Sequence, residues 1–221
     1  MHHIFVDFEM NHIAGQYTEE RTYSKMEIVE IGAVMLDEQY HEISSFQTYV
    51  RPEYNDKIEK QCTKVTGITT ETVADAPVLW TALQQFVQWC GSESLTVYAW
   101  SDSDLKQLKR ELNLKEIECK ELHRLCDHWE DFQRTFCNLL GIEKRVALKH
   151  AINAIQSEFD GAEHDALWDA RNTAKIFALS KNESEFQRIM GPVIEAFKPV
   201  TPMTSTLGDL FPDMAKLLEN S

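Results

Sequence analysis

The sequence has few features of secreted, membrane or zinc-binding proteins. No apolar run reaches the ~20 residues that cross a bilayer. The first segment contains an acid at Asp7, too early for the apolar stretch of a signal peptide. The cysteines are odd in number and include no CxxC pair: Cys62, Cys90, Cys119, Cys126 and Cys137. We therefore expect reduced and mostly buried cysteines, no disulfide framework or zinc site, no membrane partner, and a cytoplasmic location.

Positive charge is scarce as well. The 221 residues include 22 Lys and Arg against 36 Asp and Glu, a net charge of −14. This balance argues against broad contact with nucleic acid, because phosphate binding normally needs a basic face. Carboxylates that hold divalent cations nevertheless form an electropositive site, so a local grip on a strand end is still compatible with this charge. The residues nearest to a basic surface are Lys106, Lys109, Arg110, Lys144, Arg145 and Lys149, most of which we expect on solvated faces.

The apolar patterns predict an α/β fold. Three β-rich runs at 4–8, 27–36 and 46–50 are joined by short connections, which favours antiparallel pairing. Two later strands are expected at 95–100 and 126–131, and helices at 77–90, 101–112, 132–140, 147–155 and 166–179. This order predicts a mixed sheet with helices on both faces. The pattern weakens after Asn182, so we expect one domain over 1–180 and a C-terminal appendage over 181–221, with one small helix at 210–218.

Two acids lie in or just after the first strand run. Asp7 and Glu9 are two apart, so a strand places both on one face, with Val6 and Phe8 on the other. Two neighbouring carboxylates repel each other, and a divalent cation such as Mg²⁺ or Mn²⁺ removes that repulsion. A DxE pair is common, however, and a solvated loop or sheet edge explains it equally well.

A further acid lies where a strand run ends and a helix begins, the usual place for a site in an α/β sheet. Ser101 and Asp104 also fit a helix-capping pattern, which explains the acid without any metal. Asp104 lies beside the apolar stripe of its helix and can stay near the sheet. Asp102 is its rival for a metal role.

A histidine and an acid open a late helix. His164 precedes the helix and Asp169 lies in its first turns. A histidine outside a helix can move, and its ordinary pKa near 6.5 suits a general base at neutral pH. A surface histidine followed by helix-start acids is the simpler explanation of this segment alone, and Asp165 is the expected cap.

Taken together, these residues resemble the DEDDh branch of the DnaQ-like 3′-to-5′ exonucleases, within the RNase H-like superfamily. Asp7 and Glu9 match the first motif, Asp104 the second, and His164 with Asp169 the third. The run at 30–34 looks like the second strand of the family, and 66–69 looks like its TGIT turn. The stretch at 148–174 looks like the Eri-like subgroup, which also contains bacterial KapD-type proteins. The resemblance covers about residues 3–180. Two positions differ from the family pattern. Trp168 stands where many relatives have a second acid, and Met10 follows Glu9 where many proofreading relatives carry Thr-Gly.

The resemblance implies an RNase H-like five-stranded sheet in which the first three strands are antiparallel and the later ones parallel. It also implies two Mg²⁺ or Mn²⁺ ions held by Asp7, Glu9, Asp104 and Asp169. It implies that His164 takes the proton from the attacking water, with nucleoside 5′-monophosphates as products. The substrate would be the 3′ end of a single strand, with RNA favoured. Residues expected to hold the terminal base are Phe8, Met10 and Trp100, although core packing explains each of them as well.

Two alternatives remain open. The acidic surface and the C-terminal appendage allow a regulatory protein on the same fold, which binds a protein partner through that appendage and inhibits a sporulation route, as the KapD resemblance implies. DNA 3′-to-5′ exonuclease activity, including proofreading, is the second alternative, and the Eri-like features favour RNA over it.

Overall fold

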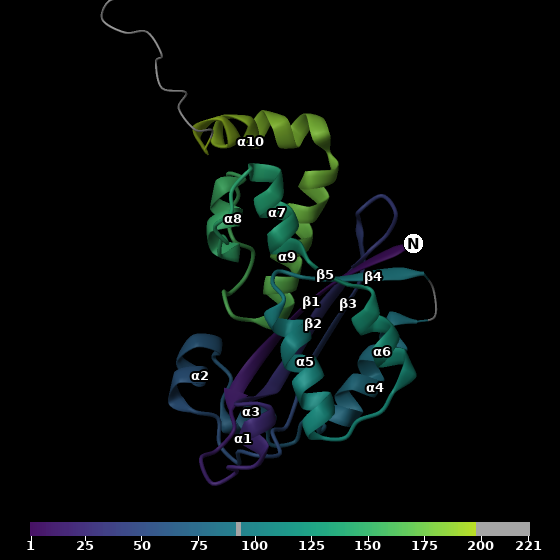
Figure 1. Ribbon diagram of the computed structural model, residues 1–221, viewed down its shortest axis with the longest axis vertical. Coiled ribbons are helices and arrows are strands. Elements are labelled where there is room, and N and C mark those ends of the chain that lie inside the picture. The colour runs from purple at the N-terminus through teal and green to yellow at the C-terminus, as the bar shows by residue number, and fades with distance from the viewer. Residues whose placement is uncertain (92–93, 198–221) are drawn as a thin grey trace, which may run out of the picture.

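The computed structural model describes residues 1–91 and 94–197, which form helices around one five-stranded sheet (Figure 1). The strands lie in the order β3 (Glu42–Tyr49), β2 (Met26–Leu36), β1 (His2–His12), β4 (Leu95–Ala99) and β5 (Trp129–Asp131). β1–β2 and β2–β3 are antiparallel, and β1–β4 and β4–β5 are parallel. The predicted mixed sheet, with antiparallel first strands and parallel later ones, is confirmed.

Helices cover both faces of the sheet (Figure 1). One apolar core lies under α4 (Leu79–Cys90), α5 (Ser103–Leu114) and α6 (Lys120–Asp127). The other lies under α7 (Phe132–Leu140), α8 (Leu148–Ala154), α9 (Ala166–Lys181) and α10 (Glu183–Phe197). Three short helices connect the remaining segments: α1 (Glu20–Tyr23), α2 (Lys60–Thr66) and α3 (Thr70–Val73). β1 serves both cores, since Ile4 and Val6 face the first and Phe5 the second.

Several element boundaries differ from those expected. β1 runs to His12 because β2 pairs with it along most of its length, from His3 opposite Leu36 to His12 opposite Met26. β5 is shorter than expected, because Cys126 belongs to α6, where its helical spacing from Leu122 buries both in the first core. α5 begins at Ser103, two residues later than expected.

The segment expected to be a C-terminal appendage contributes to the second core. α10 packs against α9 and α7, and its Phe186 and Met190 are 4% and 0% exposed. The helix expected at 210–218 lies outside the described residues. The division of the chain at residue 180 therefore stays a prediction.

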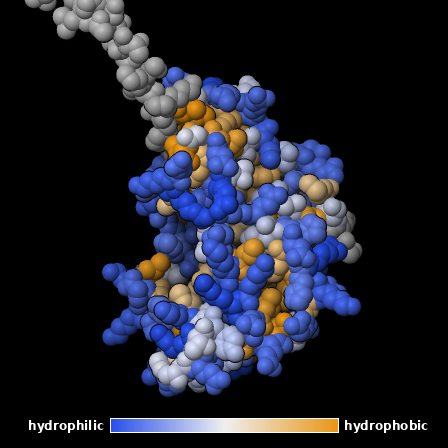
Figure 2. Space-filling model, in the orientation of Figure 1, coloured by the Kyte–Doolittle hydropathy of each residue, from blue (hydrophilic) through white to orange (hydrophobic). Residues whose placement is uncertain are grey.

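The surface is largely polar, and the cysteines are free. Hydrophilic side chains dominate the face shown in Figure 2. All five cysteines are free, and Cys90, Cys126 and Cys137 are buried. Within the described ranges, no helix has the length and apolar character needed to cross a membrane.

Candidate active site

Strand β1 carries the first two acids in the middle of the sheet. Asp7 lies opposite Gly32 of β2, and Glu9 lies opposite Glu30. Val6 and Phe8 pack in the first core, so Asp7 and Glu9 share the other face, as predicted. The pairing register shifts between Glu9 and Met10. Such a bulge re-aims the side chains beside it and is often found next to active sites.

Asp104 joins these acids from the first turn of α5. It is 4% exposed, and its Oδ1 accepts a hydrogen bond of 3.3 Å from the backbone N–H of Phe8. The Ser103 hydroxyl donates to its Oδ2 at 3.2 Å. β4 pairs with β1 only as far as Phe5. The Asp104 carboxylate therefore satisfies a β1 donor beyond the end of β4, which fixes α5 against the strand.

Its rival Asp102 is engaged elsewhere. The Asp102 carboxylate forms ion pairs with Lys106 at 2.7 Å and with Arg145 at 3.5 Å. The hydrogen bond from Lys106 is the main cause that lowers the pKa of Asp102, as expected for a charged surface carboxylate. Of the two acids, Asp104 is the one that the structure places among the other carboxylates.

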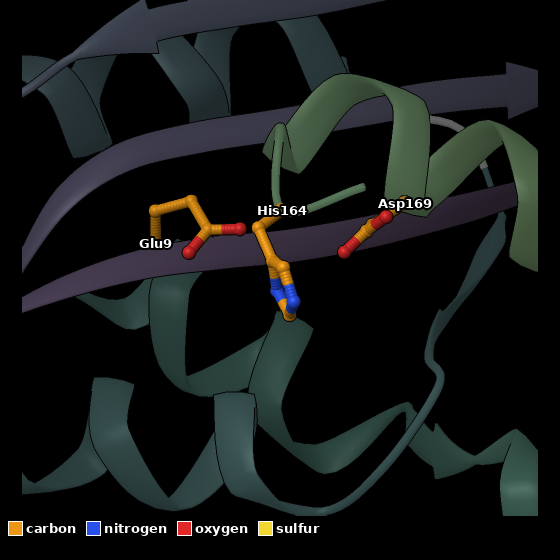
Figure 3. Close-up of side chains that lie close together, drawn as sticks. All are labelled: Glu9, His164 and Asp169. Atoms are coloured by element: carbon orange, nitrogen blue, oxygen red, sulfur yellow. The ribbon is translucent and has the colours of Figure 1, made fainter. Parts of the chain in front are cut away.

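His164 and Asp169 approach from the start of α9 (Figure 3). His164 is exposed and has a φ of 62°, a left-handed backbone conformation. Asp165 follows it and caps α9, accepting hydrogen bonds of 3.1 Å from the backbone N–H groups of Leu167 and Trp168. One potential ligand atom each of Glu9, His164 and Asp169 lies within 4.8 Å of the others. In Figure 3 the two carboxylates point toward each other across the imidazole.

Two β2 residues allow α9 to start this close to the sheet. A Cβ added to Gly32 would lie 2.1 Å from the Leu167 nitrogen and 2.2 Å from the Ala166 carbonyl carbon, so only glycine fits. Glu30, 1% exposed, accepts from the Ala166 N–H at 3.3 Å and from the Gln47 amide at 2.7 Å. Sequence reasoning treated Glu30 and Gly32 only as part of a family run and did not identify Gln47.

A buried amide holds the loop that carries His164. Asn172 of α9 is 0% exposed, and its amide donates to the Asp160 carbonyl at 2.9 Å while its Oδ1 accepts from the Asp160 N–H at 3.0 Å. Gly161 follows with a φ of 73°, and a Cβ there would lie 2.2 Å from the Trp168 ring. Trp168 therefore covers the loop backbone. Sequence reasoning missed the part that Asn172 plays, because nothing in its spacing marks it.

The acids are destabilised by burial and by one another. Burial raises the pKa of Asp7 well above its usual range, and the charges of Asp104, Asp169 and Glu9 raise it further. Burial, then Asp169 and Glu30, raise the pKa of Glu9 to about 9. Burial raises the pKa of Asp169 to about 7 and that of Asp104 to about 6. Each of these carboxylates thus favours a proton or a cation nearby.

This donor set fits divalent cations. The Oδ1 atom of Asp169 is buried and has no hydrogen-bond partner within the part of the chain that the structure describes. An unpartnered buried carboxylate oxygen is costly unless a cation approaches it. A set of carboxylate oxygens such as this one suits Mg²⁺ or Mn²⁺.

Of the three residues predicted to hold the terminal base, two are core residues. Phe8 and Trp100 are 4% and 8% exposed, and the Trp100 indole donates to the Val146 carbonyl at 3.1 Å. Core packing accounts for both side chains, because an aromatic ring closed off on all sides has no face for a base. Met10 is partly buried directly after Glu9 and remains a candidate.

Comparison with known proteins identifies the family. A family model described as Exonuclease (RNase_T) matches residues 4–177. The chain belongs to this exonuclease family. The predicted resemblance is confirmed.

Individual relatives agree with the family. "ERI1 exoribonuclease 2" of Danio rerio is 31% identical over 195 residues, which cover 78% of this chain and 34% of that protein. "Probable 3'-5' exonuclease KapD" of Bacillus subtilis (strain 168) is 23% identical and is covered over 86% of its length. The solved nuclease domain of 3'hExo, a DEDDh family member bound to rAMP, shares the fold at a TM-score of 0.71 and 22% identity, over 83% of this chain and 94% of that one. The exonuclease thus spans about a third of the length of the first relative.

Proposed function

We propose that this exonuclease removes nucleotides from the 3′ end of single-stranded or short structured RNA, releases nucleoside 5′-monophosphates, and depends on two Mg²⁺ or Mn²⁺ ions. The observation that carries the proposal is the convergence of four acids and one histidine from β1, α5 and the start of α9. Buried like charges cost stability, so their gathering needs a cationic ligand to offset it. Metal-assisted hydrolysis of a phosphodiester is the chemistry that such a cluster suits best.

The residues take distinct parts in this proposal. Asp7, Glu9 and Asp169 would hold the ions, and Asp104 would hold them directly or through a water. When bound, such ions lower the pKa of a water and stabilise the leaving 3′-oxygen. His164 would take the proton from the attacking water through a ring nitrogen as the water oxygen joins phosphorus. The bond from phosphorus to the 3′-oxygen would break, the 3′-oxygen would gain a proton from solvent water, and the terminal nucleotide would keep the phosphate on its 5′ side.

The preference for RNA rests on the name of a relative. The Danio rerio relative is called an exoribonuclease, but this chain matches only 34% of its length. Degradation of DNA 3′ ends remains the alternative at the same site. Free cysteines are consistent with the proposed cytoplasmic location. A protein partner bound through residues 181–221 stays a prediction.

The decisive experiment incubates 5′-labelled single-stranded RNA and DNA of matched sequence with the protein and Mn²⁺. We expect one-nucleotide shortening from the 3′ end, 5′-monophosphate products and no reaction in EDTA. Asp7→Asn and Asp104→Asn should abolish shortening, whereas Asp102→Asn should retain it, because Asp102 faces Lys106 and Arg145. Failure of the wild-type protein to shorten either strand, or full activity of Asp7→Asn, would overturn the proposal.

A further inference from the structure

A cleft of about 750 Å³ opens beside the catalytic acids, between the α1 segment and α5. One part of its wall is Met10, which directly follows Glu9. Another part is Ser103, whose hydroxyl donates to Asp104 Oδ2 at 3.2 Å. One end of the cleft therefore lies beside residues of the candidate active site, and Lys106, Gln107 and Arg110 continue its wall along α5.

The wall of this cleft is basic in a chain of net charge −14. Four basic side chains line it: Arg21, Lys25, Lys106 and Arg110. Lys25 and Arg110 are exposed, and within residues 1–91 and 94–197 neither side chain makes a hydrogen bond or an ion pair. The single acid on the wall, Asp102, is already paired with Lys106 and with Arg145, which lies outside the cleft. The net charge of the wall is thus positive and is available to an anionic ligand.

The cleft has a fixed floor and an aromatic edge. Gln107, 4% exposed, donates to the Met26 carbonyl at 2.7 Å and contacts the Ser24 hydroxyl at 3.3 Å, so α5 is fastened to the start of β2. Ser103, Lys106 and Arg110 of the lining are spaced three and four residues apart, on one face of the helix. Tyr23 lines the same cleft with 49% of its surface exposed, although a large aromatic side chain gains by burial.

We propose that this cleft holds the single strand upstream of its terminal nucleotide, with Lys25 and Arg110 on the phosphates and Tyr23 stacked on a base. A positive groove that follows the backbone, with an aromatic side chain on which bases stack, is how proteins bind single strands without reading sequence. Along α5, Arg110 lies about 9 Å beyond Asp104, at 1.5 Å per residue. Only a strand that continues upstream of its terminal nucleotides can reach Arg110. The inference rests on the proposed function and adds a dependence on substrate length.

The test measures kcat/KM on single-stranded RNAs of two to twelve nucleotides. The variant is Lys25→Gln/Arg110→Gln, and the matched control is Lys109→Gln, an exposed lysine of α5 that does not line this cleft. Two lost phosphate contacts should reduce the salt slope by ~1.4, which corresponds to roughly tenfold weaker binding near 0.15 M salt. We expect that fall on the twelve-nucleotide strand, no change on the dinucleotide, and wild-type values for Lys109→Gln. Tyr23→Ala should show the same dependence on length.

Binding is measured separately, by fluorescence anisotropy of a twelve-nucleotide strand on an Asp169→Asn background, so that cleavage does not interfere. Equal losses on short and long strands, or an unchanged salt slope in the double variant, would overturn the cleft as a strand track. Failure of the wild-type protein to cleave any strand would instead overturn the proposed function. In that case the anisotropy measurement would still decide whether the cleft binds a strand.

Discussion

Gly32 of β2 and Leu167 of α9 approach so closely that a Cβ on Gly32 would lie 2.1 Å from the Leu167 nitrogen. This contact lies at the centre of the candidate active site, because Gly32 is opposite Asp7 in the β1–β2 ladder. α9 begins against Gly32, with His164 just before the helix and Asp169 in its first turn. Because Gly32 has no side chain, the segment that carries His164 and Asp169 can approach Asp7 and Glu9.

Gly32→Ala should therefore affect activity more than fold. Overpacking of a filled core costs ~1–3 kcal/mol, and a shift of catalytic groups by about 1 Å can cost roughly 100-fold in rate. We expect urea unfolding to show a loss in that range, with kcat reduced at least tenfold. Gly15→Ala is the control, since a Cβ at Gly15 meets nothing within 4 Å. Wild-type kcat in Gly32→Ala would show that the close approach is not needed.

The spacing of apolar residues was sufficient to predict a mixed sheet whose first three strands are antiparallel, and to place Asp7 and Glu9 on one face of β1. Alternation along β1 correctly separated Asp7 and Glu9 from Val6 and Phe8, because that pattern follows directly from strand geometry. The choice between Asp102 and Asp104 was harder. A sequence shows that both lie at a helix start, but not that the Phe8 N–H lacks a partner and that Asp104 supplies it.

The features that escaped sequence reasoning depend on contacts between distant segments. Glu30 of β2 accepts hydrogen bonds from Gln47 of β3 and from the start of α9. No local sequence pattern predicts this contact between three elements. Trp100 was predicted to hold a base because it is an aromatic residue near the site. Its burial could be known only once α7 and α8 were placed over it.

Removal of the proposed general base, His164, should lower the rate of cleavage and leave the fold unchanged. His164→Asn keeps the left-handed backbone conformation at low cost, since asparagine adopts it more readily than most residues. We expect kcat to fall by roughly 100- to 10,000-fold, with an unchanged urea midpoint. His150→Asn, an exposed histidine of α8, should retain wild-type kcat. A His164→Asn enzyme with wild-type kcat would assign the proton transfer to another group.

Stability without metal should fall as the pH rises. Burial and mutual repulsion raise the pKa of Asp104 to about 6, of Asp169 to about 7 and of Glu9 to about 9. The folded state therefore holds these protons more tightly than the unfolded chain does. The stability that they contribute is complete below the ordinary carboxyl range and is lost as the pH rises through those values. In EDTA, the midpoint of thermal unfolding should drop steadily between pH 5 and pH 9.

Divalent cations should reverse this trend. Bound Mg²⁺ or Mn²⁺ replaces the protons and stabilises the folded state by mass action, so the difference in melting temperature with and without metal should widen from pH 5 to pH 9. Glu9→Gln removes the group with the highest of these pKa values and should flatten the profile in EDTA. Identical profiles for the wild-type protein in EDTA and in Mn²⁺ would contradict a cation site at these acids.

The loop before α9 depends on one amide. Asn172→Ala would leave the Asp160 N–H and carbonyl without the partners that they have now, which costs about 1 kcal/mol because Asp160 is exposed and water can replace part of this bonding. Because that loop leads directly to His164, we expect kcat to fall together with stability. Lys175→Gln tests the exposed contacts to the same loop, where the ammonium of Lys175 pairs with Asp160 at 2.8 Å, and should change stability by less than ~1 kcal/mol. Hydrogen exchange over residues 158–164 separates the two effects, since only Asn172→Ala should speed exchange there. Loss of kcat without faster exchange would mean that Asn172 acts by a route other than holding the His164 loop.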